Sequence, residues 1–452
     1  MTTAEESVEN GVFDRRLRGF TLGILACVGM VAFESLGVAT ILPTVAEDLD
    51  GLSAYGWGLS ALMLANIVGT VIAGASIDRR GPARTVTVGL LTFAAGCLLA
   101  GLAPNWPLFI GARAVQGLGV GAIMAFAYSL VGLAYPPRLQ AVMFAFLSSA
   151  WTIPSLVGQV LAGVIASTAD WRIVFWVIAP IMILLLPLIL PQARALNVTQ
   201  QASGGSSRAI ALSGVLTIGA TLLLIGLNLT AIVVVVGAAV IGVVIAVVAL
   251  VRLTPAGTLR AARGVPAGIV IRFLMCGVYF GSEAFLPLGL STIHGISATP
   301  AGIGLAAGAL AWVAGSFVQA RLDAWRPGRR ALATTLGFAV LLVGEALMGT
   351  AVAIEGMWAG WAVIGWTVGG LGMGVAFNAA TSTTMALAPT ERAGNISANL
   401  QLAQTLATAL MAGIGGAVIA HSGATTSSFL IIFALTAALG LLGTALSHRT
   451  TP

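Results

Sequence analysis

Long apolar runs follow one another along most of the chain, and short segments between them carry most of the charge. A helix needs about 20 predominantly apolar residues to cross the hydrocarbon core of a bilayer. These runs predict an all-α, polytopic membrane protein with fourteen transmembrane helices. The runs lie near residues 20–43, 55–77, 85–103, 107–133, 139–168, 171–191, 209–228, 231–251, 266–290, 299–320, 331–353, 358–386, 393–420 and 425–447.

The composition excludes a soluble protein. Of the 452 residues, 58% are hydrophobic and 8% are charged, whereas soluble proteins carry roughly 25% charged residues. The formal net charge of +6 is the difference between 21 arginines and 15 acidic residues, and the chain has no lysine. The arginines form no basic stripe that could follow a phosphate backbone, so a nucleic-acid partner is not expected. The expected surroundings are a lipid bilayer.

The positions of the arginines predict the orientation of the helices, because cytoplasmic loops are enriched in basic residues. With the N-terminus inside and the fourteen spans alternating, 18 of the 21 arginines fall on the cytoplasmic side. Arg172 falls outside, and Arg113 and Arg272 fall within helices. Both termini are therefore predicted to be cytoplasmic. The absence of lysine is typical of a GC-rich bacterial genome and favours a bacterial plasma membrane.

An internal repeat indicates two halves. Residues 117–141 resemble residues 370–394, and more weakly residues 69–84 resemble residues 315–330. Close helix packing would explain any single glycine of the repeat, but the whole pattern is typical of transporters built from two six-helix halves. The expected division is a cytoplasmic tail 1–19, an N-terminal half 20–191, a linker with two extra transmembrane helices 192–264, a C-terminal half 265–447 and a cytoplasmic tail 448–452. The matching positions are Gly117, Gly119, Gly121 and Pro136 with Gly370, Gly372, Gly374 and Pro389.

Three motifs carry a family resemblance that covers essentially the whole chain. The fourth span reads Arg113-Ala-Val-Gln116-Gly117-Leu-Gly119-Val-Gly121, and Glu34 stands nine residues before Pro43 in the first span. The segment after the second span reads Gly74-Ala-Ser-Ile-Asp78-Arg79-Arg80-Gly81-Pro-Ala-Arg84. Together they resemble the major facilitator superfamily, specifically its fourteen-helix drug:proton antiporter branch. The resemblance implies a cytoplasmic gating loop formed by Gly74, Asp78, Arg79, Gly81 and Arg84.

The fifth span departs from the antiporter pattern of that branch. Gln159 stands where the pattern has a proline, and Ala162 stands where it has a glycine. That pattern marks export in the branch. The direction of transport is therefore left open by the resemblance.

Charged residues inside spans are the candidates for proton coupling, because a charge in the bilayer core is costly and usually functional. By the helical rise, Glu34 lies roughly 14 Å and Arg113 roughly 9 Å from the outer ends of their spans. We expect the two to face one cavity and to influence each other's proton affinity; a static ion pair is the alternative. Glu283, in the ninth span, is the third candidate. Glu345 is expected to be structural, and Arg272 to reach the cytoplasmic interface with no assigned role.

Polar residues within other spans complete the expected substrate cavity: Gln116, Tyr128, Gln159, Asn378 and Gln401. Such residues suit an amphipathic or cationic ligand. No phosphate-binding loop is possible without lysine, and no cofactor, metal site or enzymatic constellation is expected. The sequence thus predicts a monomeric secondary transporter that exports small amphipathic or cationic compounds in exchange for protons. A proton-coupled importer, or a lipid or metabolite transporter on the same fold, is the alternative.

Overall fold

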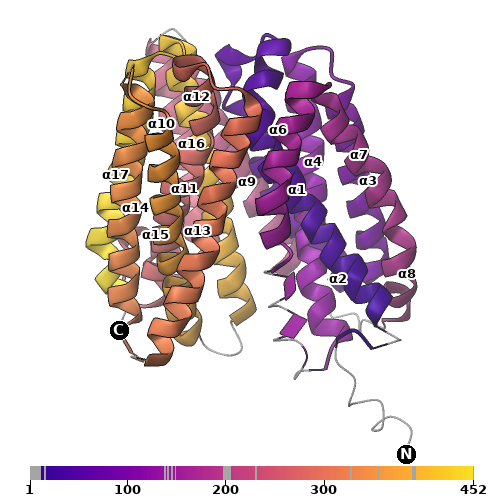
Figure 1. Cartoon of the computed structure of the whole chain (residues 1–452). Coiled ribbons are helices and arrows are strands. Elements are labelled where there is room, and N and C mark those ends of the chain that lie inside the picture. Colours follow the sequence, from indigo (N-terminus) through magenta and orange to yellow (C-terminus); the bar gives the residue numbers. More distant parts are fainter. Residues whose placement is uncertain are drawn as a thin grey trace, which may run out of the picture.

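A computed structural model shows a bundle of long helices that lie roughly side by side (Figure 1). It describes residues 12–14, 17–136, 139, 142–143, 146–147, 149–196, 205–229, 232–325, 328–354, 356–388 and 393–450. No strand occurs in these ranges. The predicted all-α, polytopic fold is therefore confirmed.

The helices fall into an N-terminal group, a middle pair and a C-terminal group. The N-terminal group is α1 (Arg18–Asp48), α2 (Trp57–Arg80), α3 (Pro82–Gly101), α4 (Trp106–Ala134), the π-helical turn η3 (Pro154–Gly158), α6 (Gln159–Thr168), α7 (Arg172–Leu184) and α8 (Leu186–Ala195). The middle pair is α9 (Gly205–Leu227) and α10 (Ile232–Leu253). The C-terminal group is α11 (Val265–Glu283), α12 (Leu286–His294), α13 (Ala298–Trp325), α14 (Arg330–Ala353), α15 (Gly360–Ala386), α16 (Ala393–Ser422) and α17 (Thr426–Leu446).

Thirteen helical segments of the described residues are long and apolar enough to cross a membrane. They match thirteen of the fourteen predicted spans. The remaining span, residues 139–168, is described only in part, and its described end consists of η3 and α6.

Proline breaks two of the spans. The sixth span divides into α7 and α8, and the first turn of α8 contains Pro187. The ninth span divides into α11 and α12, and the first turn of α12 contains Pro287. Proline has no N–H to donate within a helix and favours the first turn of a new one. The break in the ninth span therefore places Glu283 at the last position of α11.

The two groups pack their helices in the same order. In the N-terminal group α4 packs against α2 and α3, and α3 also packs against α7. In the C-terminal group α15 packs against α13 and α14, and α14 also packs against α17. Figure 1 shows the groups on opposite sides of the bundle. The repeat seen in the sequence is thus a repeat of packing.

The repeated glycines let these helices approach closely. A Cβ on Gly121 would lie 2.4 Å from the Asn66 carbonyl oxygen of α2, and one on Gly374 would lie 2.1 Å from the Trp312 carbonyl oxygen of α13. Both positions exclude any side chain. For these glycines the packing interpretation is sufficient.

The middle pair lies at the edge of the bundle. α9 packs against α10, α2 and α16, and Leu224 of α9 fills the space left by Gly413 of α16. α10 is the least buried of the spans and exposes a row of valines. The pair therefore contacts both groups while leaving one helix to face lipid.

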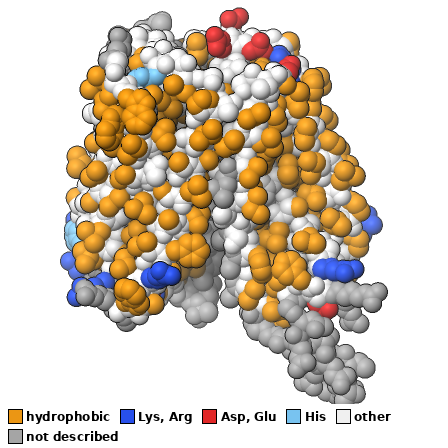
Figure 2. Space-filling model, viewed as in Figure 1, with side chains coloured by type: hydrophobic (Ala, Val, Ile, Leu, Met, Phe, Trp, Pro, Cys, Tyr) orange, Lys and Arg blue, Asp and Glu red, His pale blue; other side chains and the backbone are white. Residues whose placement is uncertain are grey.

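Charge divides the molecule into two ends. The acidic side chains gather at the end of the bundle where α1 finishes, and the arginines gather at the opposite end (Figure 2). We call them the acidic end and the arginine end. Described acidic-end residues include Glu47, Asp48, Asp50 and Asp170, and described arginine-end residues include Arg79, Arg80, Arg84, Arg194, Arg252 and Arg321.

Gly121→Leu should destabilise the protein by about 1–3 kcal/mol, the usual cost of overpacking. The added side chain would separate α4 from α2. The midpoint of thermal unfolding in detergent measures the effect. Gly111→Leu on the same helix is the control, because a Cβ there meets nothing within 4 Å; equal midpoints for the two variants would contradict the packing role of Gly121.

Candidate functional site

The N-terminal and C-terminal groups are sealed against each other near the acidic end. Ser60 Oγ of α2 donates to the Ala409 carbonyl oxygen of α16 at 2.8 Å, and Tyr55 Oη donates to the Ala284 carbonyl oxygen at 3.2 Å. Gly56 and Gly416 touch backbone to backbone, so a Cβ on Gly416 would lie 2.6 Å from the Gly56 Cα. Toward the arginine end the two groups diverge (Figure 1). The structure is thus closed at the acidic end.

Glu34 and Arg113 form a buried ion pair between α1 and α4. Their side chains are 0% and 1% exposed, and Arg113 Nη1 donates to Glu34 Oε1. Arg113 Nη1 also donates to Gln116 Oε1 at 2.8 Å, and Gln116 Nε2 donates to Cys97 Sγ at 3.2 Å. Glu34 Oε2 has no hydrogen-bond partner among the described residues. Gln116, expected in the substrate cavity, thus lies within this polar cluster.

Arg113 is also hydrogen-bonded to α2, the helix whose Ser60 takes part in the seal. Its Nε donates to the Gly58 carbonyl oxygen of α2 at 2.9 Å. The repeat counterpart of Arg113 is Trp366, whose Nε1 donates to the Leu305 carbonyl oxygen of α13 at 3.2 Å. Both halves keep a donor to the neighbouring helix. Only the N-terminal half uses a donor that carries charge.

Glu283 links the two groups. Its Oε1 accepts a hydrogen bond from Gln159 Nε2 of α6 at 3.3 Å. Gln159 is completely buried, and its Oε1 has no partner within the described ranges. The structure therefore brings together two residues that the sequence assigned to different roles, one to proton coupling and one to the substrate cavity.

Glu345 lies in a different environment. Its Oε1 accepts hydrogen bonds from Ser282 Oγ at 2.6 Å and from Thr436 Oγ1. These donors come from α11 and α17 of the same group. Glu345 is thus bonded to hydroxyls within the C-terminal group, and its structural role stays a prediction.

The expectation that Arg272 reaches the cytoplasmic interface is wrong. Arg272 is 5% exposed. It donates to Gln404 Oε1 at 3.3 Å and to Thr381 Oγ1, and its guanidinium lies 3.6 Å from the centre of the Phe377 ring. Partners on α15 and α16 at the same depth hold the side chain inside the bundle. The signal available in the sequence was its spacing of four, seven and eleven residues from Cys276, Tyr279 and Glu283, which places all four on one face of α11.

The other residues expected in the cavity are less closely grouped. Tyr128 of α4 is 47% exposed and lies near Arg272 of the C-terminal group. Asn378 is partly buried on α15, next to Phe377. Gln401 is exposed on α16, one turn before Gln404. The structure thus places Tyr128 near Arg272 and leaves Gln401 nearer the surface.

The expected gating loop lies at the arginine end between α2 and α3. Gly81 joins the two helices with φ of +77°, a backbone conformation that favours glycine. Arg79 and Arg84 are exposed, and Gly74 leaves open space around its Cα. The side chain of Asp78 lies outside the described residues.

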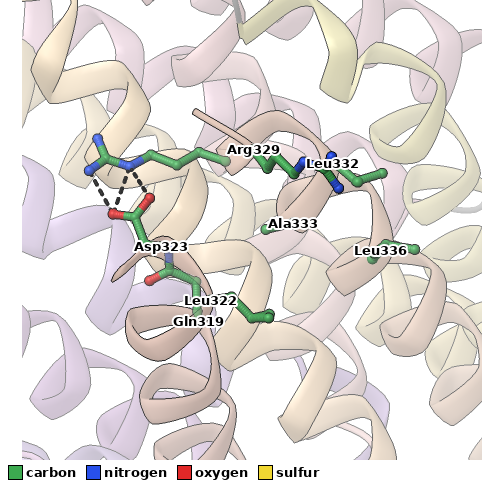
Figure 3. Close-up of a pocket in the computed structure, with 8 residues that line it drawn as sticks. Gln319, Leu322, Asp323, Arg329, Leu332, Ala333 and Leu336 are labelled. Atoms are coloured by element: carbon green, nitrogen blue, oxygen red, sulfur yellow. Dashed lines mark hydrogen bonds and ion pairs between the residues drawn. The ribbon is translucent and has the colours of Figure 1, made fainter. Parts of the chain in front are cut away.

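The second half has an ion pair at the corresponding loop that the sequence did not single out. Arg330, the repeat counterpart of Arg84, donates two hydrogen bonds through Nε to Asp323, at 2.9 and 3.0 Å, and one through Nη2 at 2.7 Å (Figure 3). In the repeat alignment Asp78 corresponds to residue 324, one position after Asp323. This shift by one residue is why the sequence comparison of the two loops did not pair the two aspartates. The adjoining pocket holds about 190 Å³, less than the roughly 300 Å³ of a usual ligand site.

Comparison with known proteins gives matches to one family. A sequence model of the Major Facilitator Superfamily matches residues 22–410. Multidrug resistance protein 3 of Bacillus subtilis (strain 168) is 29% identical over 160 residues, 35% of this chain and 31% of that protein. Multidrug efflux pump SdrM of Staphylococcus aureus (strain N315) is 28% identical over 169 residues, 37% of this chain and 38% of that protein. The chain therefore spans about a third of the length of these curated relatives.

Solved structures share the fold. A POT family transporter in complex with a thioalcohol-conjugated peptide superposes with a TM-score of 0.71 at 17% identity, covering 99% of both chains. A POT family transporter in complex with 5-aminolevulinic acid gives a TM-score of 0.70 at 16% identity, covering 95% of this chain and 96% of that one. At these identities the likeness concerns the fold alone.

Gly56→Leu should shift the protein toward a conformation that is open at the acidic end. A Cβ on Gly56 would lie 2.1 Å from the Ala412 carbonyl oxygen across the seal. Spin labels at Arg84→Cys and Arg321→Cys, exposed on opposite groups at the arginine end, should report a shorter distance in this variant. The three native cysteines are buried. Gly111→Leu is the control, and an unchanged distance distribution in Gly56→Leu would count against the seal.

Proposed function

The chain belongs to the Major Facilitator Superfamily and is a multi-pass membrane transporter, and we propose that it exports small amphipathic compounds in exchange for protons by alternating access. The observation that carries this proposal is the buried Glu34–Arg113 pair, whose carboxylate keeps one oxygen without a hydrogen-bond partner among the described residues. The names of two relatives, a multidrug resistance protein and a multidrug efflux pump, support export of this kind.

A proton on Glu34 would act on the seal through Arg113. The pair is neutral overall when Glu34 is ionised, and it carries a net positive charge once Glu34 is protonated. An uncompensated charge in a medium of low dielectric constant is costly, so Arg113 would strengthen its remaining bonds or move. One of these bonds is to the Gly58 carbonyl oxygen, two residues from Gly56 in the seal. Protonation at Glu34 is thereby coupled to the closed end of the molecule.

Glu283 and Gln159 provide a second proton-sensitive link. An ionised Glu283 can only accept, as it does from Gln159 Nε2. A protonated Glu283 could also donate to Gln159 Oε1, the atom that lacks a described partner. Proton loading would then change the hydrogen bonding between α11 and α6 without breaking the contact.

The orientation follows from the charges at the two ends. Because basic residues are enriched on the cytoplasmic side, we place the arginine end, with both termini, in the cytoplasm of a bacterium and the acidic end outside. In this orientation, the seal between the two groups lies on the outer side of the membrane. One chain contains both packed halves and their seal, which supports a monomer.

A proton-coupled importer, or a lipid or metabolite transporter, is the second candidate. It is favoured by Gln159, which replaces the proline of the export pattern and bonds to Glu283. The two candidates predict opposite directions of substrate movement for the same proton gradient. Transport in inverted membrane vesicles therefore separates them.

Glu34→Gln should abolish transport driven by a pH gradient while leaving the folded protein in the membrane. Glutamine can still accept a hydrogen bond from Arg113, but it cannot bind or release a proton. The measurement is uptake of a lipophilic cation and of a lipophilic anion into inverted vesicles under an imposed pH gradient. Glu345→Gln is the matched control, because that buried carboxylate accepts only from hydroxyls in the structure. Gradient-driven uptake by Glu34→Gln would refute the coupling role.

Asp78→Asn should abolish transport and spare membrane insertion if the loop between α2 and α3 latches the arginine end. Loss of the carboxylate charge would weaken any ion pair that holds the latch. Vesicle transport and the amount of folded protein in the membrane are measured together. Arg80→Gln in the same loop, an exposed residue, should transport normally. Normal transport by Asp78→Asn would remove the latch from the mechanism.

A further inference from the structure

Arg272 is a buried cation that the proton-coupling mechanism does not use. It lies seven residues into α11, about 10 Å from the arginine end of that helix by the helical rise. Its described neighbours are the hydroxyl of Thr381, the amide of Gln404, the thiol of Cys276 and the ring of Phe377. Among the described residues it makes no ion pair with a carboxylate.

Within the part of the chain that the structure describes, no carboxylate compensates the charge of Arg272. Removing a guanidinium from water is costly unless an anion or several hydrogen bonds replace the water. Arg113, at comparable burial, has Glu34 as its counter-ion. Arg272 has neutral partners instead, and these fix the guanidinium in place without neutralising it. Such a guanidinium is suited to accept an anionic group from outside the chain as its counter-ion.

The position of Arg272 makes it reachable from between the two groups. Tyr128 belongs to α4 of the opposite group, yet it lies near the guanidinium of Arg272. Tyr128 also remains 47% exposed, so the two groups do not close over it. Arg272 and Tyr128 therefore lie on opposite groups, near each other, in the region where the two groups diverge toward the arginine end (Figure 1).

An aromatic wall continues from Arg272 into the bundle. The ring of Phe377 lies under the guanidinium and 5.2 Å from the ring of Trp312. Trp312 in turn lies 5.0 Å from Tyr279, and Tyr279 stacks on Trp366 at 4.3 Å. These rings come from α11, α13 and α15. The rings of Phe377, Trp312 and Tyr279 are tilted or edge-on to one another, and Phe377 and Trp312 remain partly exposed. They offer an apolar aromatic wall that a ring-containing body can contact while its charged group meets Arg272.

We propose that Arg272 and the aromatic wall of Phe377, Trp312 and Tyr279 form a binding site for amphipathic organic anions, compounds with a planar apolar body and a carboxylate. The proposal rests on the proposed transport function, and it replaces the cationic substrate class expected from the sequence with an anionic one. The guanidinium supplies a charge-assisted hydrogen bond to the carboxylate, and the rings supply the apolar contact.

The test compares three probes that share one ring system and differ in charge: 2-naphthoate, 2-naphthamide and 2-naphthylmethylammonium. Binding to the purified full chain in lipid nanodiscs is measured at neutral pH by equilibrium dialysis, with empty nanodiscs as the blank. The wild type should bind naphthoate about tenfold more tightly than naphthamide, the effect of one hydrogen bond to a charged group. It should bind naphthylmethylammonium more weakly still.

Variants assign the preference to Arg272. Arg272→Gln should bind naphthoate and naphthamide equally, and Arg272→Lys should keep part of the preference because it keeps the charge but not the planar fork. Arg321→Gln, which changes an exposed arginine at the same end of the molecule, should match the wild type. A wild type that does not prefer naphthoate, or a preference that survives in Arg272→Gln, would overturn the proposal.

The binding test needs no proton gradient, so its failure is distinct from failure of the proposed function. A preference for naphthoate that depends on Arg272 would uphold the site even if Glu34→Gln transported normally. Proton-driven export with a preference for naphthylmethylammonium would uphold the transport function and refute the anion site.

Discussion

The cost of placing charge in hydrocarbon governs this structure. A chain with 8% charged residues places most of them at the two ends of the bundle, and each charge that remains inside needs a partner. Arg113 meets that need with Glu34, Gln116 and the Gly58 carbonyl oxygen. The same bonds that stabilise the charge also connect α1, α4 and α2. The coupling element is therefore part of the helix packing.

Duplication and asymmetry have separate roles in the fold. The glycines of the repeat set the spacing of α4 against α2 and of α15 against α13 in the same way. At the position of Arg113 the second half has Trp366, and the hydrogen bond to the neighbouring helix is retained. What differs is the charge. The architecture is thus common to both halves, whereas the buried ion pair belongs to the N-terminal half and the aromatic wall with Arg272 to the C-terminal half.

The face of α11 joins the features of the second half. One side of this helix carries Arg272, Cys276, Tyr279 and Glu283. The helix ends at Glu283, and the next helix, α12, has Pro287 in its first turn. Near the arginine end this face carries a cation beside aromatic rings, and the described residues place no carboxylate against it. Near the acidic end it carries the carboxylate that bonds to Gln159 across the interface. A ligand at the first and a proton at the second would act on the same helix.

The sequence by itself determined the membrane-spanning fold, thirteen of the described spans and the packing role of the repeated glycines, because apolar length and small residues act locally and leave a readable pattern. It also selected Glu34 and Arg113, since charges inside apolar runs are rare. It could not show that Gln159 meets Glu283, that Arg330 pairs with Asp323, or that Arg272 stays inside the bundle. Those outcomes depend on which side chains of distant helices lie at the same depth, and only the tertiary structure decides that.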